Sequence, residues 1–108
     1  MTTEEKIAEL QLLEQNIQSL SLQKQRFQTE LMETENALSE LSKTKDVVYK
    51  IINGIMFAKT PEELTEELTS KKDILELRIK SIEKQEQVIR KKADSIQKEV
   101  LEEIKKTS

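Results

Sequence analysis

Two clusters of charged side chains are the parts of this sequence whose residue types could take part in chemistry. Residues 62–67 contain four glutamates, and carboxylate oxygens are the ligands that Mg²⁺ and Ca²⁺ prefer. Arg90, Lys91 and Lys92 form a basic run of the kind that can contact phosphate groups. The sequence therefore raises two possible sites, one for a metal ion and one for a nucleic acid.

Neither cluster is accompanied by the other residue types that such a site needs. The 108 residues include no His, no Cys and only one Gly, so the usual bases, thiolates and phosphate-binding loops are missing. Glutamates at the start of a helix are stabilised by its dipole, and a basic run without an aromatic neighbour is typical of a solvated helix face. We expect no catalytic site, no cofactor, no metal site and no nucleic-acid partner.

The composition favours long helices over a globular core. Charged residues make up 36% of the chain and aromatic residues 3%, with one Pro and a net charge of −3. No apolar run approaches the roughly 18 residues that a membrane span needs, and the polar start of the chain does not resemble a secretory signal. We expect a soluble, cytoplasmic protein with no membrane partner.

Two heptad seams, apolar positions at alternating steps of three and four residues, predict two coiled-coil helices. Eight of ten positions are apolar in each seam. The first seam comprises Leu10, Leu13, Ile17, Leu20, Lys24, Phe27, Leu31, Thr34, Leu38 and Leu41. The second comprises Leu68, Lys72, Leu75, Ile79, Ile82, Glu86, Ile89, Ala93, Ile96 and Val100. The polar members either fix the register of the two helices or occupy a lightly buried interface.

Capping signals set the expected boundaries. Thr2 and Glu5 fit a capping box, and Thr60, Pro61 and Glu63 fit an N-cap, first-turn proline and capping-box acid. We expect one helix–hairpin–helix domain over residues 1–108. Its first helix covers about residues 4–45, its hairpin about 47–59 and its second helix about 61–106.

The two seams are expected to pair in antiparallel order. Their spacing places Leu13 opposite residues 103–104, which leaves Ile7 and Leu10 without full partners. Unpartnered apolar residues at the open helix ends either have no binding role or form a binding surface for another molecule. The residues alone leave both interpretations open.

The middle of the chain predicts a β-hairpin. Asn53-Gly54 is flanked by β-branched runs, and both residues tolerate the positive φ that a two-residue turn requires. This turn pairs Ile52 with Ile55, Ile51 with Met56 and Tyr49 with Ala58. One face of the hairpin is then wholly apolar and the other mostly apolar, so both faces require burial.

Two helices cannot cover this hairpin. Eight apolar side chains, at about 1.5–3 kcal/mol each for full burial, set an upper bound on the order of 10–20 kcal/mol. Hairpins from several chains would bury these faces and pair their free edges in a β-barrel or sandwich. We therefore expect a mainly α fold, a long antiparallel two-helix coiled coil, whose central hairpin assembles into an oligomeric β-barrel platform. The side chains expected at this interface are Val47, Val48, Tyr49, Ile51, Ile52, Ile55, Met56 and Phe57.

Several stretches together resemble the β-type subunit of archaeal prefoldin. They are the hairpin over residues 48–57, Glu63–Leu68, Leu75–Lys80, Glu83–Glu86 and Ser21–Gln25. The resemblance covers essentially the whole chain. The family's hairpin commonly reads Gly-Asn where this chain has Asn53-Gly54.

The resemblance implies an ATP-independent chaperone, a holdase that binds non-native polypeptides and delivers them to a group II chaperonin. It also implies a heterohexamer of two α-type and four β-type prefoldin subunits, with coiled coils extending from a platform of hairpins. The expected client-binding tips comprise Ile7, Leu10, Leu13, Val100, Leu101 and Ile104. Charged residues expected to dock the chaperonin are Glu99, Glu102, Glu103, Lys105 and Lys106. The alternative is a structural coiled-coil oligomer that acts as a spacer or tether.

Overall fold

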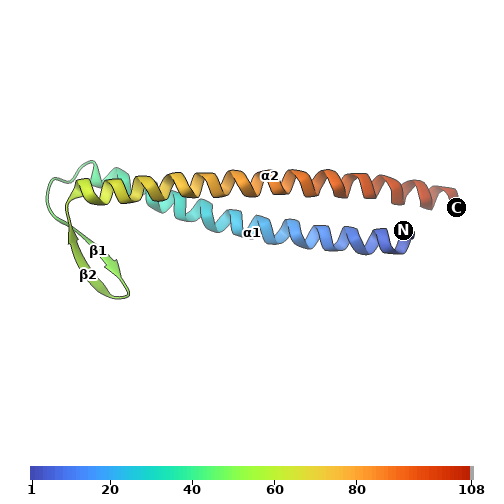
Figure 1. Cartoon of the computed structure of the whole chain (residues 1–108), viewed down its shortest axis with the longest axis horizontal. Helices are drawn as coiled ribbons and strands as arrows, with labels where there is room; N and C mark the ends of the chain where they lie inside the picture. The colour runs from blue at the N-terminus through green and yellow to red at the C-terminus, as the bar shows by residue number, and fades with distance from the viewer. Residues whose placement is uncertain (108) are drawn as a thin grey trace. The chain divides into compact units, whose positions relative to one another are not determined.

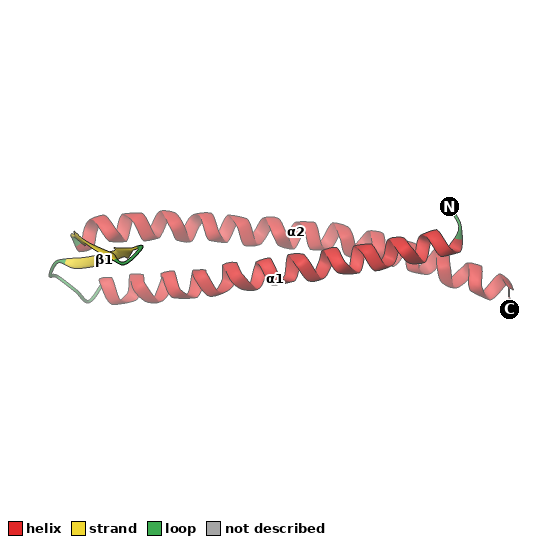
Figure 2. Cartoon of the chain, turned by 90° about the horizontal axis from the view of Figure 1, so that it is seen from below, coloured by secondary structure: helices red, strands yellow, loops and turns green. Residues whose placement is uncertain are grey.

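Two long helices flank a β-hairpin in the computed structural model, which describes residues 1–107. Helix α1 spans Thr3–Leu41, strand β1 Val48–Ile52, strand β2 Ile55–Lys59 and helix α2 Pro61–Thr107. Figure 1 shows this order along the chain, and Figure 2 colours the two helices red and the short strands yellow. The predicted mainly α fold, with its central two-stranded hairpin, is confirmed.

Both helices start where the capping signals predict. Thr2 Oγ1 accepts a hydrogen bond from the backbone N–H of Glu5 at 3.1 Å. Thr60 Oγ1 accepts the corresponding bond from the N–H of Glu63 at 3.2 Å, and Pro61 is the first residue of α2. Each hydroxyl thereby satisfies an N–H group that has no partner inside the helix.

Helix α1 ends at Leu41, four residues earlier than predicted. Ser42 Oγ donates a hydrogen bond to the Ser39 carbonyl at 2.7 Å, and Thr44 Oγ1 donates one to the Glu40 carbonyl at 3.1 Å. These hydroxyls satisfy carbonyl groups that would otherwise have no partner in the last turn. Short polar side chains that compete for backbone bonds thus end the helix before the β-branched residues that begin at Val47.

The heptad seams are confirmed as the buried stripe of each helix. All ten positions of the first seam and all ten of the second are buried or half-buried. Leu75 is the most deeply buried of them, with 2% of its surface exposed. Periodicity alone therefore identified the faces that the two helices turn toward each other.

The contacts divide the chain into two compact units, and both helices contribute to each. One unit comprises Met1–Arg26 and the part of α2 that follows Arg78; the other comprises Phe27–Arg78. In the first, Leu13, Ile96 and Val100 form a buried cluster. In the second, Leu41 and Leu75 are buried, and the Arg78 guanidinium lies 5.6 Å from the centre of the Phe27 ring, a cation–π contact.

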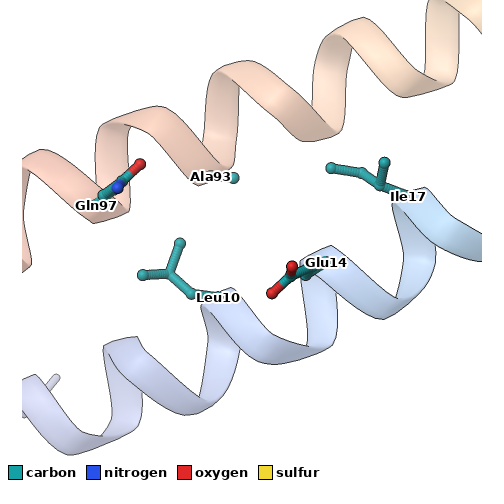
Figure 3. A pocket seen from close by; sticks show the side chains of 5 residues that line it. All are labelled: Leu10, Glu14, Ile17, Ala93 and Gln97. Atoms are coloured by element: carbon teal, nitrogen blue, oxygen red, sulfur yellow. The ribbon is translucent and has the colours of Figure 1, made fainter.

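The predicted register is wrong in the first unit. Leu13 packs with Ile96 and Val100 rather than with residues 103–104, and Leu10 packs against the same cluster. Figure 3 shows Leu10 of α1 facing Ala93 and Gln97 of α2. Leu10 is therefore not the unpartnered residue that the sequence predicted. A heptad pattern fixes which face is buried but not the axial offset, since each shift by one heptad again matches apolar positions.

Two polar seam residues pair with each other, which the sequence did not predict. Lys24 Nζ donates a hydrogen bond to Glu86 Oε1 at 2.7 Å, and only 7% of the Glu86 side chain is exposed. Thr34 is buried as well, and its hydroxyl donates to the Glu30 carbonyl within its own helix. The Lys24–Glu86 ion pair is thus an interaction between the helices that only one register allows.

The hairpin has the predicted register and turn. Ile52 pairs with Ile55, Ile51 with Met56 and Tyr49 with Ala58. Asn53 and Gly54 have φ values of 50° and 79°, the left-handed conformation that a two-residue type I′ turn needs at both positions.

Replacing one member of the Lys24–Glu86 pair is expected to destabilise the fold more than replacing both. Lys24→Leu leaves the Glu86 carboxylate buried without its cation, a cost on the order of 3–5 kcal/mol for a fully buried pair and less here, where Lys24 is partly exposed. The double variant Lys24→Leu, Glu86→Leu should recover most or all of the loss. Urea unfolding followed by circular dichroism measures both. Equal stabilities for the single and double variants would contradict this account.

Candidate functional site

The hairpin concentrates large exposed apolar side chains on a short stretch of the chain. Val48 is half-buried, and the other seven predicted interface residues are exposed, Ile51 the most at 66%. These seven are Val47, Tyr49, Ile51, Ile52, Ile55, Met56 and Phe57. Such a concentration of large apolar side chains marks an interaction surface. Seven of the eight predicted residues lie on β1 and β2, and Val47 directly precedes β1. Their role in assembly stays a prediction.

Two ion pairs join the hairpin to α2. Lys50 Nζ lies 2.9 Å from Glu67 Oε2, and Lys59 Nζ lies 3.3 Å from Glu67 Oε1. One carboxylate on α2 therefore contacts a lysine from each strand. In the sequence, Glu67 is only one member of a glutamate cluster, and this bridge was not predicted. Two lysines on one hairpin face nevertheless indicate that an anion lies nearby.

The six predicted tip residues fall into two groups. Leu13 and Val100 are buried, with 7% and 6% of their surface exposed, and Leu10 is half-buried beside them. Ile7, Leu101 and Ile104 are exposed, at 40%, 51% and 49%. Only these last three present apolar surface while the two helices stay packed.

A cluster of polar bonds joins the two helices close to these tips. Glu103 accepts bonds from the Thr3 hydroxyl and the Lys6 ammonium, and Lys6 Nζ also lies 3.4 Å from Glu99. Glu103 and Lys6 are partly covered, with 33% and 15% of their side-chain surface exposed. Helix α2 therefore runs alongside the first turn of α1. Ile7, which was expected to lack a full partner on the second helix, is 40% exposed.

The pKa values of this cluster are displaced in the directions that favour charge. The bond from Lys6, followed by the bond from Thr3, lowers the pKa of Glu103, and burial opposes them. The bond to Glu103 raises the pKa of Lys6, and burial opposes that rise. Both groups are therefore held in their charged forms around neutral pH.

The five charges predicted to dock a chaperonin differ in how they are engaged. Glu99 and Glu103 contact Lys6, as described above. Glu102, Lys105 and Lys106 are exposed, and the two lysines lie in the last turn of α2, where its dipole favours cations. Their role in docking stays a prediction.

The glutamate cluster at residues 62–67 and the basic run at residues 90–92 contribute to the fold. Glu62 and Glu63 lie in the first turn of α2, and Glu67 contacts two lysines. Lys92 of the basic run lies 3.3 Å from Glu9 on α1.

Within residues 1–107 no group of three acidic, His or Cys side chains is placed to hold a metal ion. In the same range, neither helix is both long and apolar enough to cross a membrane.

Glu103→Gln is expected to lower the thermal midpoint by a few degrees at about pH 7 and to have no effect at about pH 2. The folded-state pKa of Glu103 lies below its unfolded value. Its contribution to stability is therefore present above the unfolded pKa and is lost as the pH falls through the folded pKa. Thermal unfolding at both pH values measures the effect, with the exposed Glu102→Gln as the matched control. A deficit for Glu103→Gln that is the same at both pH values would contradict this assignment.

The sequence is similar to those of known proteins. The profile of the family described as prefoldin subunit matches residues 4–107. The prefoldin subunit beta of Sulfurisphaera tokodaii is 38% identical over 55 residues, which are 51% of this chain and 44% of that protein. The prefoldin subunit beta of Methanospirillum hungatei is 37% identical over 57 residues, which are 53% and 48% of the two chains. This chain thus spans about half the length of the curated relatives it matches.

A solved structure matches over more of the chain. The crystal structure of the prefoldin beta subunit from Thermococcus strain KS-1 superposes with a TM-score of 0.85 and 28% sequence identity. The match covers 91% of this chain and 88% of that one. The resemblance predicted from the hairpin and helix stretches is confirmed: the chain belongs to the prefoldin subunit family.

Proposed function

We propose that this chain is a subunit of an ATP-independent chaperone, assembled through its hairpin, that holds non-native polypeptides at its helix ends. The observation that carries the proposal is the hairpin, whose apolar side chains are exposed on both faces in a chain of the prefoldin subunit family. A single chain leaves this surface in water, so its burial favours association with further hairpins.

The expected assembly is a heterohexamer of two α-type and four β-type subunits, of which this chain supplies the β-type. Paired hairpin edges would form its β-barrel platform, because closure removes unpaired backbone groups at the strand edges. In this proposal the protein is cytoplasmic, catalyses no reaction, and passes its clients to a group II chaperonin. The charges at Glu99, Glu102, Glu103, Lys105 and Lys106 are the proposed docking contacts.

Client binding is assigned to the exposed apolar residues at the helix ends. Leu101 and Ile104 are about half exposed and lie three residues apart, so they share one face of α2. Ile7 adds exposed apolar surface on α1. Leu10, Leu13 and Val100 would take part only where a client separates the helices, because they are covered in the packed pair.

The double variant Leu101→Ser, Ile104→Ser is expected to suppress aggregation several-fold less well than the unchanged chain. The assay dilutes a chemically denatured enzyme into buffer with the assembled protein and no nucleotide, and records light scattering. Leu22→Ser with Val88→Ser is the matched control, since these apolar residues are at least as exposed but lie elsewhere on the helices. Equal suppression by both double variants would exclude the tip assignment. Assembly without any suppression by the unchanged chain would favour the spacer or tether.

Ile51→Asp is expected to prevent assembly while leaving the helices intact. An aspartate here would place a charge inside the proposed platform, and burying an unpaired charge is strongly unfavourable. Native mass spectrometry, with and without an α-type subunit, measures the assembly, and circular dichroism checks the helices. Asp46→Asn, an exposed change in the loop before β1, is the control. A variant that still forms the complete assembly would contradict a platform built from hairpins.

A further inference from the structure

The hairpin meets α2 through a three-residue ionic bridge that the family resemblance did not predict. Lys50 belongs to β1, Lys59 to β2 and Glu67 to the second turn of α2. Each carboxylate oxygen of Glu67 lies within 3.3 Å of a lysine Nζ. The bridge lies entirely within the unit formed by residues 27–78.

Strand pairing explains why one carboxylate reaches both lysines. Val48 pairs with Lys59 and Lys50 with Phe57, so Lys50 and Lys59 are diagonal neighbours on the same face of the hairpin. Two ammonium groups in this arrangement repel each other unless an anion lies between them. Glu67 supplies that anion, which makes the contact between hairpin and helix specific for this face.

The bridge is partly withdrawn from water. The side chains of Lys50, Lys59 and Glu67 are 34%, 29% and 39% exposed, and Glu67 Oε2 itself is fully covered. Covered oxygens lose hydration and depend on nearby cations for compensation. Oε2 has Lys50 at 2.9 Å, although the angle between them is not that of a hydrogen bond.

The electrostatics agree with this geometry. Contact with the Lys50 ammonium is the largest cause of a lowered pKa at Glu67; burial opposes it, and the bond from Lys59 adds to it. On α2, Glu63 and Lys71 lie one turn away on either side, and no charged group of α1 contributes to the shift. The carboxylate is therefore held ionised by the two hairpin lysines.

The bridge makes the two hairpin faces unequal. Lys50, Lys59 and Val48 share one face and are half-buried, whereas Ile52, Ile55 and Phe57, which lie nearer the turn on the same face, are 45–60% exposed. Tyr49, Ile51 and Met56 share the other face and are 59–66% exposed. The part of the bridge face held toward the chain's own helix is less available to a neighbour, while the opposite face is exposed along its whole length. The opposite face is therefore the one fully presented outward.

We propose that Glu67 is a positioning residue that holds the Val48–Lys50–Lys59 face toward α2, so that the Tyr49–Ile51–Met56 face packs against the hairpin of another subunit. This inference rests on the proposed assembly through hairpins. Beyond that assembly, it specifies the hairpin face that is buried between subunits and the carboxylate that selects this face. In the absence of the bridge, the two-stranded element samples several orientations, and assembly must first restrict them.

The test measures hairpin orientation and assembly in the same variants. The chain has no cysteine, so Ile52→Cys and Lys71→Cys accept two spin labels, one beside the turn and one on α2. In this labelled background, pulsed electron paramagnetic resonance should give a narrow distance distribution. Glu67→Gln should broaden it, and in the unlabelled chain should raise the midpoint concentration of assembly with an α-type subunit about tenfold. The adjacent, exposed Glu66→Gln is the matched control and should change neither.

Two further readouts separate positioning from a general loss of stability. The distribution should broaden as the pH falls through the lowered pKa of Glu67, because protonation removes the anion, and Glu67→Gln should abolish this pH dependence. The charge exchange Lys50→Glu, Lys59→Glu, Glu67→Lys rebuilds a three-residue bridge and should restore the narrow distribution. A Glu67→Gln variant with unchanged distances and unchanged assembly would overturn the inference. Failure of the unchanged chain to assemble at all would instead overturn the proposed function.

Discussion

The fold depends on a hydrophobic surface that one chain cannot bury. Strands β1 and β2 are too short and too few to cover their own apolar side chains, and an isolated two-stranded hairpin is marginally stable in water. Tyr49, Ile51 and Met56 are more than half exposed as a result. The helices bury their own apolar residues in the seam, and α2 contributes the Glu67 carboxylate to the hairpin. The apolar surface that remains is the basis for proposing that the chain is one part of an assembly.

Ion pairs determine the axial register of the two helices, which the hydrophobic periodicity does not specify. Lys24 with Glu86, and Lys6 with Glu99 and Glu103, each join residues from opposite helices at one particular offset. A heptad shift would keep leucine against isoleucine but would separate these charges. Buried polar residues in coiled coils have the same effect on register elsewhere. The register of the helices thus depends on a few charged residues, whereas their hydrophobic packing depends on the seam.

Much of the fold was predictable because it rests on local signals. Asn53-Gly54 determined the turn and strand register, Thr60 with Pro61 determined the start of α2, and the seams determined the buried faces. The axial offset of the helices and the Glu67 bridge were not predictable, since both join residues distant in sequence whose partners no local pattern specifies. Leu13 and Val100, two of the predicted client contacts, are buried in the packed pair of helices. Exposure, which depends on that offset, reduces the accessible tip to Ile7, Leu101 and Ile104.

The central claim is that assembly buries the hairpin face that carries Tyr49, the only tyrosine of the chain. Incorporating fluorotyrosine into this chain alone provides a single ¹⁹F nucleus on that face, whichever partner subunits are added. The measurement is the solvent accessibility of this nucleus by fluorine NMR, before and after assembly with an unlabelled α-type subunit. The account predicts that a soluble paramagnetic probe broadens the signal of the free chain strongly and that of the assembly weakly. A tyrosine that stays equally accessible in the assembly would contradict it.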